Sequence, residues 1–256
     1  MKRVLYRVVI LLCILGILVS GYQLYGILSE YAKGEAVYDD TAQRYTTQAE
    51  EPDLPAEDTS GAGTGTKHTP PITVDFDRLL EENPDVVGWL YCEGTPINYP
   101  ILQGADNEVY LHRMIDGSYN SAGSLFMDYR CSPDFSSLHT ILYGHNMKNK
   151  SMFGTLRNYK EQSYYDLHPS LWLLTPTENI RIDLVAGLVL PADSGLYQTI
   201  SDEEQLQSCL SQALDESTFL SDVEISEHTQ LITLSTCSYE YDEARYVLLG
   251  VPVFVE

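Results

Sequence analysis

Three side chains in the C-terminal half of the sequence could together transfer an acyl group. Cys237 ends the run Thr-Leu-Ser-Thr-Cys, and Arg245 follows eight residues later on a second alternating segment, a pattern typical of the two arms of a β-hairpin. If the two side chains lie opposite each other, the guanidinium can reach a carbonyl group bound over the thiol. His145 follows a short apolar run and a Gly, at the end of a predicted strand. The sequence thus predicts a nucleophile, a fixed cation and a proton carrier in one site.

Each of these residues also has an ordinary structural interpretation. An isolated Cys is usually a small buried hydrophobe, but Cys237 directly precedes a polar loop at 238–243, where a side chain is accessible. Arg245 could form a solvated ion pair with one of the carboxylates in that loop. Of the six His residues, only His112 competes with His145 for the role of proton carrier.

The order and context of these motifs resemble those of the sortases, the surface transpeptidases of Gram-positive bacteria, and most of all those of class B. The resemblance extends from about Thr73 to the C-terminus. It includes four further blocks, at 85–90, 99–104, 124–130 and 143–147. Each block alone would be a weak signal, whereas their number and order are hard to obtain by chance.

The resemblance implies a cysteine transpeptidase that carries out two acyl transfers. Cys237 attacks the Thr carbonyl of a Pro-x-Thr-Gly-like sorting motif in a secreted protein, His145 protonates the leaving amine, and Arg245 stabilises the oxyanion. A peptidoglycan amine then resolves the thioester, and a pilin lysine is the alternative acceptor. Two rival interpretations are a Cys-His cell-wall peptidase, which would not need Arg245, and an anchored binding module in which Cys237 is inert.

Four further residues are candidates for substrate binding. The segment at 103–111 matches a class B pattern, and the resemblance assigns Asn107 and Leu111 to the substrate groove. Ser235, within the Cys237 run, and Tyr197, before the longest predicted helix, are further candidates. For each of the four, packing in a turn or in the core is the alternative. No His or Cys pair has metal-ligand spacing, so neither a metal nor another cofactor is expected.

The N-terminus has the pattern of a membrane anchor. Residues 1–7 form a basic tip with three Lys and Arg, and residues 8–28 form an apolar run long enough to cross a bilayer as a helix. Basic residues favour the cytoplasmic side, which predicts a single-pass protein of the cell membrane with an extracellular catalytic domain. A cleaved signal peptide is the alternative, but no clear cleavage motif follows Ser20 and Gly21.

The part beyond the anchor is strongly acidic. Of fifteen Lys and Arg residues, three lie in the basic tip, which leaves twelve against thirty-seven Asp and Glu. Such a surface repels phosphate polyanions, so nucleic-acid binding is not expected. Residues 29–71 are poor in large apolar side chains and rich in acids, Thr, Gly and Pro. They are therefore predicted to be a flexible stalk that does not pack against the catalytic domain, 72–256.

Strands predominate in the predicted catalytic domain. Alternating runs bounded by turn residues predict seven strands, at 97–102, 124–128, 140–143, 171–175, 180–190, 230–236 and 246–255. Helices are predicted at 75–83, 151–159, 163–168 and 201–214, the last of which begins with a capping box. Seven closely spaced strands predict a closed barrel or a sandwich. The sortase resemblance implies the barrel, mainly β, with seven or eight strands and added helices.

The five Cys residues do not form an evident disulfide framework. Cys13 lies in the predicted anchor, and Cys209 lies on an apolar helical stripe that predicts a core position. Cys92 and Cys131 lie near predicted strand ends, and the sequence leaves a disulfide between them open.

Overall fold

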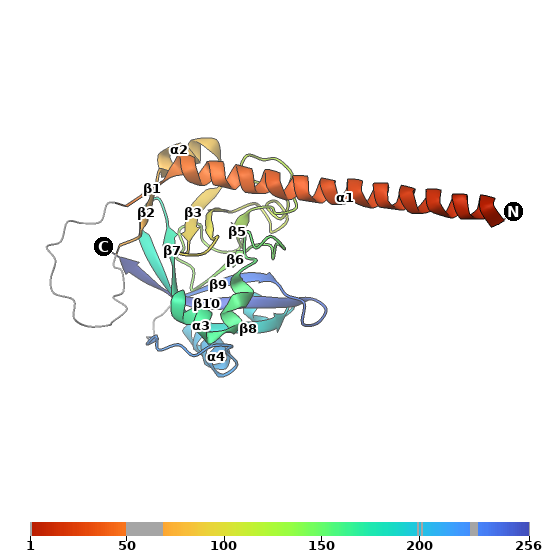
Figure 1. Ribbon diagram of the computed structural model, residues 1–256. Helices are drawn as coiled ribbons and strands as arrows, with labels where there is room; N and C mark the ends of the chain where they lie inside the picture. Colours follow the sequence, from red (N-terminus) through yellow and green to blue (C-terminus); the bar gives the residue numbers. More distant parts are fainter. Residues whose placement is uncertain (1, 50–68, 199, 201, 226–229, 256) are drawn as a thin grey trace, which may run out of the picture.

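The computed structural model describes residues 2–49, 69–198, 200, 202–225 and 230–255. Among these residues, eight strands close into a barrel from which one long helix projects (Figure 1). The barrel strands are β3 (Val86–Tyr91), β4 (Asn98–Leu102), β5 (Leu125–Met127), β6 (His139–Tyr143), β7 (Ser170–Leu174), β8 (Asn179–Pro191), β9 (Leu231–Cys237) and β10 (Ala244–Val255). Their order around the barrel is β10-β8-β7-β3-β4-β5-β6-β9. The mainly β, closed-barrel fold predicted above is confirmed.

Seven barrel strands lie within about two residues of the predicted runs. The sequence did not predict β3, because its residues form a continuous apolar run rather than an alternating one. In the structure, four of its six residues are buried, including the consecutive Trp89 and Leu90. A strand covered on both faces carries no period-two signal.

Short helices fill the connections between the strands. They are α2 (Phe76–Glu82), the 3₁₀ helix η1 (Leu156–Lys160), α3 (Gln162–Leu167), the 3₁₀ helix η2 (Gly195–Tyr197) and α4 (Glu203–Asp215). The helix predicted at 151–159 is shorter, since Met152 has a φ of 52°, which an α-helix does not accept. The predicted capping box began at Ser201, which lies outside the described residues. Asp202 caps α4 by accepting a hydrogen bond from the Gln205 backbone N–H.

The N-terminal helix differs most from the sequence predictions, because it is longer than predicted and packs against the barrel. Helix α1 (Lys2–Tyr45) continues well beyond the apolar run, and β1 (Thr46–Gln48) then pairs with β2 (Ile72–Val74). A stripe of four residues at helical spacing is buried against the barrel: Gly34, Tyr38, Thr41 and Tyr45. The prediction of a flexible, unpacked stalk is therefore wrong for residues 29–48. Residues 50–68 of that predicted stalk lie outside the described residues.

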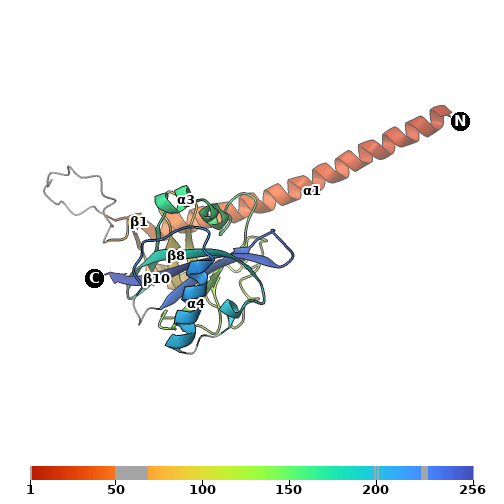
Figure 2. The ribbon, with the colours of Figure 1, turned by 90° about the horizontal axis from the view of Figure 1, so that it is seen from below.

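The apolar part of α1 stands clear of the barrel, as both views of the ribbon show (Figure 2). Large apolar side chains between Val4 and Leu28 are exposed along it. Among the described residues, α1 is the one helix long and apolar enough to cross a membrane.

Among the described residues, two apolar clusters stabilise the folded part. The larger one fills the barrel around Trp89 and Tyr246, and the smaller one lies between α4 and the strands β8 and β10 (Figure 2). Cys209 is only partly buried at the edge of the smaller cluster. All five Cys residues lie in the described part of the chain and are free. Cys92 is buried near the Tyr159 hydroxyl, and Cys131 points its Sγ at the His139 carbonyl, 3.5 Å away.

Candidate active site

The strand order β6-β9-β10 brings the three predicted catalytic residues to one end of the barrel. Cys237 and Arg245 are direct partners in the antiparallel β9–β10 pair, which confirms the predicted hairpin. Side chains of such partners stand on the same face, with Cβ atoms about 5 Å apart. On its other side, β9 runs parallel to β6, with Tyr143 opposite Ser235. Cys237 lies two residues beyond Ser235, and His145 lies two residues beyond Tyr143.

The segment after β6 is bonded to the segment that carries the thiol. The Gly144 N–H donates to the Ser235 carbonyl at 3.2 Å, and the Thr236 hydroxyl donates to the Gly144 carbonyl at 2.7 Å. Asn146 Nδ2 donates to the carbonyl of Cys237 itself at 2.8 Å. A Cβ at Gly144 would lie 2.4 Å from a Leu125 methyl, so no larger residue fits there. These contacts hold His145 beside the partly buried Cys237.

The His145 ring is oriented by a backbone carbonyl and by a second imidazole. Its Nε2 lies 2.7 Å from the Leu111 carbonyl, and its ring stacks on His112 with centroids 5.4 Å apart. Burial lowers the pKa of His145, an effect that His112 reinforces and the Leu111 carbonyl opposes. The ring is therefore mostly neutral at pH 7. Because a carbonyl accepts only from N–H, the proton lies on Nε2, which leaves Nδ1 to accept another.

Arg245 is anchored at the start of β10. Its Nη1 donates to the Ala244 carbonyl at 3.1 Å, and its Nη2 lies 3.3 Å from a carboxylate oxygen of Glu243. The Glu243 side chain is 78% exposed, so this ion pair is solvated and easily exchanged. The guanidinium is thus held next to Cys237 and can turn toward a bound carbonyl group.

Tyr197 and Ser235 contact each other in the structure. The Tyr197 hydroxyl lies 2.8 Å from Ser235 Oγ, and its ring stacks on Tyr143 with centroids 6.3 Å apart. Burial raises the pKa of Tyr197, while Arg245 lowers it. Ser235 is only 2% exposed, so Tyr197 covers it. The structure therefore places both candidates beside the catalytic end, with Tyr197 as the more accessible one.

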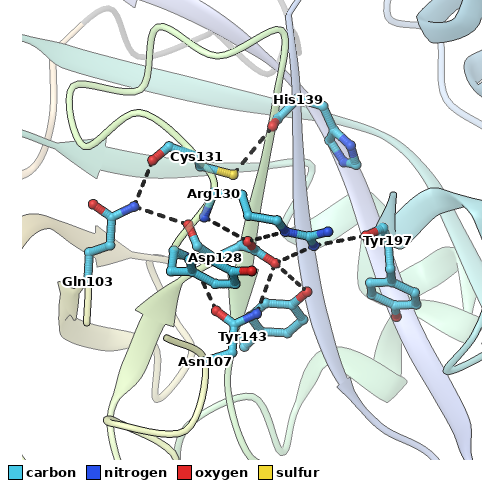
Figure 3. Close-up of polar contacts among 9 residues, drawn as sticks. Gln103, Asn107, Asp128, Arg130, Cys131, His139, Tyr143 and Tyr197 are labelled. Carbon is cyan, nitrogen blue, oxygen red and sulfur yellow. Dashed lines mark hydrogen bonds and ion pairs between the residues drawn. The ribbon is translucent and has the colours of Figure 1, made fainter. Parts of the chain in front are cut away.

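Asn107 belongs to a polar network centred on Asp128 (Figure 3). Its Nδ2 donates to Asp128 at 3.0 Å, and its Oδ1 accepts from the Tyr129 N–H at 3.1 Å. Arg130 binds the same carboxylate through Nε and Nη2, at 2.8 and 2.7 Å, and also donates to the Tyr197 carbonyl at 2.9 Å. The network thus connects Asn107 to Tyr197.

The charge of Asp128 is maintained despite its burial. Burial alone would raise the pKa of this 1%-exposed carboxyl group, but hydrogen bonds from Arg130 and Asn107 lower it to about 2. No local pattern in the sequence indicated a role for Asp128 or Arg130, although both lie in one of the blocks that carry the sortase resemblance. The stacking of His112 on His145 and the bond from Asn146 to Cys237 were not predicted either, because they join segments far apart in sequence.

Leu111 contributes through its backbone as well as its side chain. Its carbonyl orients His145, and its side chain is half-buried on the same loop. Among the described residues, no group of three or more His, Cys, Asp or Glu side chains is placed to hold a metal ion. The arrangement can instead support covalent acyl transfer, since a thiol lies between a neutral imidazole and a guanidinium.

Comparison with known proteins identifies the family. The chain is 32% identical to sortase B of Listeria monocytogenes over 243 residues, which cover 93% of this chain and 93% of that protein. This chain belongs to the sortase B family. The solved structure of sortase B from B. anthracis in complex with AAEK1 matches with a TM-score of 0.73 and 27% identity, over 89% of this chain and all of that one. A Staphylococcus aureus sortase B–substrate complex matches with a TM-score of 0.67 and 29% identity, over 71% and 85% of the two chains.

No family model matches the chain. The similarity to the sortase B proteins nevertheless spans the barrel, and it confirms the class B resemblance drawn from the sequence motifs. As a sortase, the chain is a transpeptidase.

Proposed function

We propose that this chain is a membrane-anchored cysteine transpeptidase that cleaves a C-terminal sorting motif of secreted proteins and transfers them to a peptidoglycan amine. The observation that carries the proposal is the β6-β9-β10 register, which sets Cys237 directly opposite Arg245 and beside the segment of His145. A Cys that only fills space in the fold has no use for a guanidinium and an imidazole beside its thiol.

The first acyl transfer begins with the neutral His145. Its Nδ1 accepts the thiol proton, and the resulting thiolate of Cys237 attacks the Thr carbonyl of the sorting motif. Arg245 stabilises the oxyanion that forms, because its guanidinium presents several donors in a fixed plane. The C–N bond breaks, His145 returns its proton to the leaving amine, and a thioester joins the substrate to Cys237.

The second transfer releases the product. An amine attacks the thioester, His145 accepts its proton, and the new amide bond forms as the thiolate of Cys237 leaves. We assign this amine to peptidoglycan, and a pilin lysine is the alternative. The substrate is proposed to be a peptide because the S. aureus sortase B was solved as a substrate complex. Leu111, Tyr197, Asn107 and Ser235 are proposed to line or support its groove.

The proposed location is the cell membrane, with the N-terminus in the cytoplasm and the barrel outside. The exposed apolar length of α1 and the basic residues before it support this orientation. The partners are then a sorting-signal peptide, a cell-wall amine and the bilayer, and no nucleic acid is expected.

The role of Arg245 provides the sharpest test of this proposal. Arg245→Ala should slow single-turnover acylation by a sorting-motif peptide about 100- to 1000-fold, as expected for the loss of an oxyanion donor. Arg245→Lys should also be poor, because a Lys ammonium lacks the planar fork. Thioester formation is followed by mass spectrometry, and alkylation of Cys237 checks that the thiol is still accessible.

Glu243→Gln is the matched control, since it removes only the ion-pair partner of Arg245. It should acylate at nearly the wild-type rate. If Arg245→Ala acylates as fast as Glu243→Gln, the guanidinium acts only in a surface ion pair, and the Cys-His peptidase becomes the better interpretation.

A further inference from the structure

The barrel begins where the apolar run of α1 ends. Glu30, two residues after the end of that run, is bound by the barrel on both its backbone and its side chain. Asn120 Nδ2 donates to the Glu30 carbonyl at 3.0 Å, and the Ser121 N–H donates to its carboxylate at 2.8 Å. Five residues later, about 7.5 Å along the helix axis, Glu35 accepts a hydrogen bond from Asn149 Nδ2 at 2.8 Å.

These contacts leave little freedom between the proposed membrane span and the barrel. Helix α1 is continuous from the span to Tyr45, and the Tyr38 hydroxyl donates to the Gly123 carbonyl at 2.6 Å. The barrel is therefore held in a fixed orientation relative to the span. The segments bound to Glu30 and Glu35 must then lie next to the lipid headgroups.

We propose that residues 30–35, 112–121 and 147–150 form a surface that docks on the headgroups of the bilayer in which α1 is anchored. We refer to these residues as the juxtamembrane surface. The inference rests on the membrane anchor proposed above and adds that the catalytic end of the barrel is held against the membrane.

The charge of the juxtamembrane surface differs from that of the protein as a whole. Four of the fifteen Lys and Arg residues lie on it, against three of the thirty-seven Asp and Glu. The four basic side chains are exposed, and they are Lys33, Arg113, Lys148 and Lys150. Two of the three carboxylates, Glu30 and Glu35, accept the hydrogen bonds described above. The surface thus carries a small positive formal charge in a part of the chain that is otherwise strongly acidic, which suits it to anionic headgroups.

An aromatic side chain stands out from the same surface. Tyr119 is 75% exposed, and Tyr is favoured at membrane interfaces because its ring is apolar and its hydroxyl is polar. Its ring lies 5.8 Å from that of His112, which in turn stacks on His145. The proposed contact therefore reaches the catalytic site through one intervening side chain.

The arrangement of the barrel agrees with this orientation. In Figures 1 and 2, the turn between β9 and β10 lies on the side of the barrel toward which α1 projects, and the C-terminus lies on the opposite side. Cys237 and Arg245 flank that turn. A peptide must then approach the site along the membrane surface rather than from the side facing away from it.

The test uses the full chain in vesicles whose lipids carry a nitroxide on the headgroup. The two native Trp residues, Trp89 and Trp172, are buried, so a Trp introduced at an exposed site can be followed by its fluorescence. Tyr119→Trp should be quenched much more strongly by the labelled lipid than Phe254→Trp. Phe254 is 55% exposed on β10 near the C-terminus, which makes it the matched control.

A second pair of variants tests the role of charge. In vesicles that contain phosphatidylglycerol, Lys148→Gln with Lys150→Gln should weaken the quenching at position 119, by about fivefold in the contact equilibrium for each Lys removed. Arg78→Gln with Arg157→Gln, which changes two exposed cations elsewhere, should leave it unchanged. Equal effects of the two pairs would overturn the proposed attraction to anionic lipid.

The outcomes separate the two proposals. If the chain resists alkaline extraction from the vesicles but Trp at 119 is quenched no more than Trp at 254, the anchor stands and the docking surface is wrong. If alkali extracts the chain, the anchor is wrong and the docking inference fails with it.

Discussion

At the scale of single residues, His145 is set up to be neutral. Its Nε2–H is bound to the Leu111 carbonyl, and burial lowers its pKa, so that Nδ1 is open to a proton. The His112 ring stacks on that of His145 and reinforces the lowering of its pKa, but it offers His145 no proton acceptor in the proposed mechanism. The two imidazoles, adjacent in space, should therefore differ greatly in their importance for turnover.

His145→Ala should lower turnover of a sorting-motif peptide by about 100- to 10,000-fold, because both proton transfers lose their carrier. His112→Gln should stay within about tenfold of the wild type, since it removes stacking but no proton acceptor. The measurement is steady-state cleavage, with circular dichroism to check the fold. The opposite ranking would transfer the catalytic role to His112.

Asp128 is a second residue whose charge matters. Asp128→Asn would leave Arg130 without its counter-ion and weaken the grip of Arg130 on the Tyr197 carbonyl. We expect a loss of about 2 kcal/mol in the free energy of unfolding, because the buried carboxylate loses charge-assisted hydrogen bonds while the exposed Arg130 can be solvated. We also expect a raised KM for the peptide, because Tyr197 and Asn107 lose a common support.

Asp183→Asn is the control for this effect. It disrupts another Asp–Arg pair spaced two residues apart, with Arg181 Nε 2.7 Å from Asp183, on β8. Stability should fall, but the KM should not change. A KM that responds equally to both substitutions would mean that Asp128 acts only on global stability.

At the scale of elements, the barrel-side half of α1 is part of the fold. A chain that starts at Glu30 keeps the buried Tyr38 and Tyr45, whereas one that starts at Thr69 loses both, together with β1. The shorter chain should be less stable by at least about 3 kcal/mol, from the lost burial of two Tyr side chains. Urea unfolding of the two chains measures the difference.

Tyr38→Phe measures the contribution of a single hydroxyl group to the packing of α1 on the barrel. It removes the hydroxyl that binds the Gly123 carbonyl and should cost about 1 kcal/mol. Gly123 lies so close to the Leu111 carbonyl that a Cβ there would be only 2.3 Å from it. Weaker anchoring of Gly123 should therefore also displace the Leu111 carbonyl, which orients His145, and so reduce turnover. Equal stability of the chains starting at Glu30 and Thr69 would restore the interpretation of α1 as a separable stalk.

Features that depend on a local sequence pattern could be predicted, whereas contacts between residues far apart in sequence could not. Alternation along β9 and β10 is local, so it predicted both strands and placed Cys237 opposite Arg245. The bond from Asn107 to Asp128 spans 21 residues, and that from Tyr197 to Ser235 spans 38, so neither left a local pattern. The buried stripe on α1 did leave one, at helical spacing. It was missed because the polar residues between its members lowered the apolar content of the segment.

At the scale of the whole molecule, the buried imidazole of His139 and the half-buried one of His145 link folding to pH. Burial lowers the pKa of His139 to about 4, and its Nε2 lies 2.9 Å from the Thr233 hydroxyl between β6 and β9. The pKa of His145 is also lowered by burial. A group with a lowered pKa binds protons more readily in the unfolded chain, so it favours unfolding below its ordinary pKa of about 6.5.

The contribution of His139 to the free energy of unfolding should therefore be constant above about pH 6.5 and should decrease as the pH falls toward about 4. Below about pH 4, titration of His139 should cause no further decrease. For a pKa lowered from 6.5 to about 4, the loss is at most about 3 kcal/mol. His139→Gln can keep a hydrogen bond to Thr233 without titrating, and it should flatten this slope. His168→Gln, outside the barrel interior, is the control.

The large negative charge of the protein acts in the opposite direction, because protonating carboxylates relieves their mutual repulsion. Comparing variant and wild type at each pH cancels this common contribution. The measurement is the free energy of unfolding in urea between about pH 7 and about pH 4.5. If His139→Gln follows the wild-type curve in parallel across this range, protonation of His139 does not drive acid unfolding, and the β6–β9 contact is not the pH-sensitive part of the barrel.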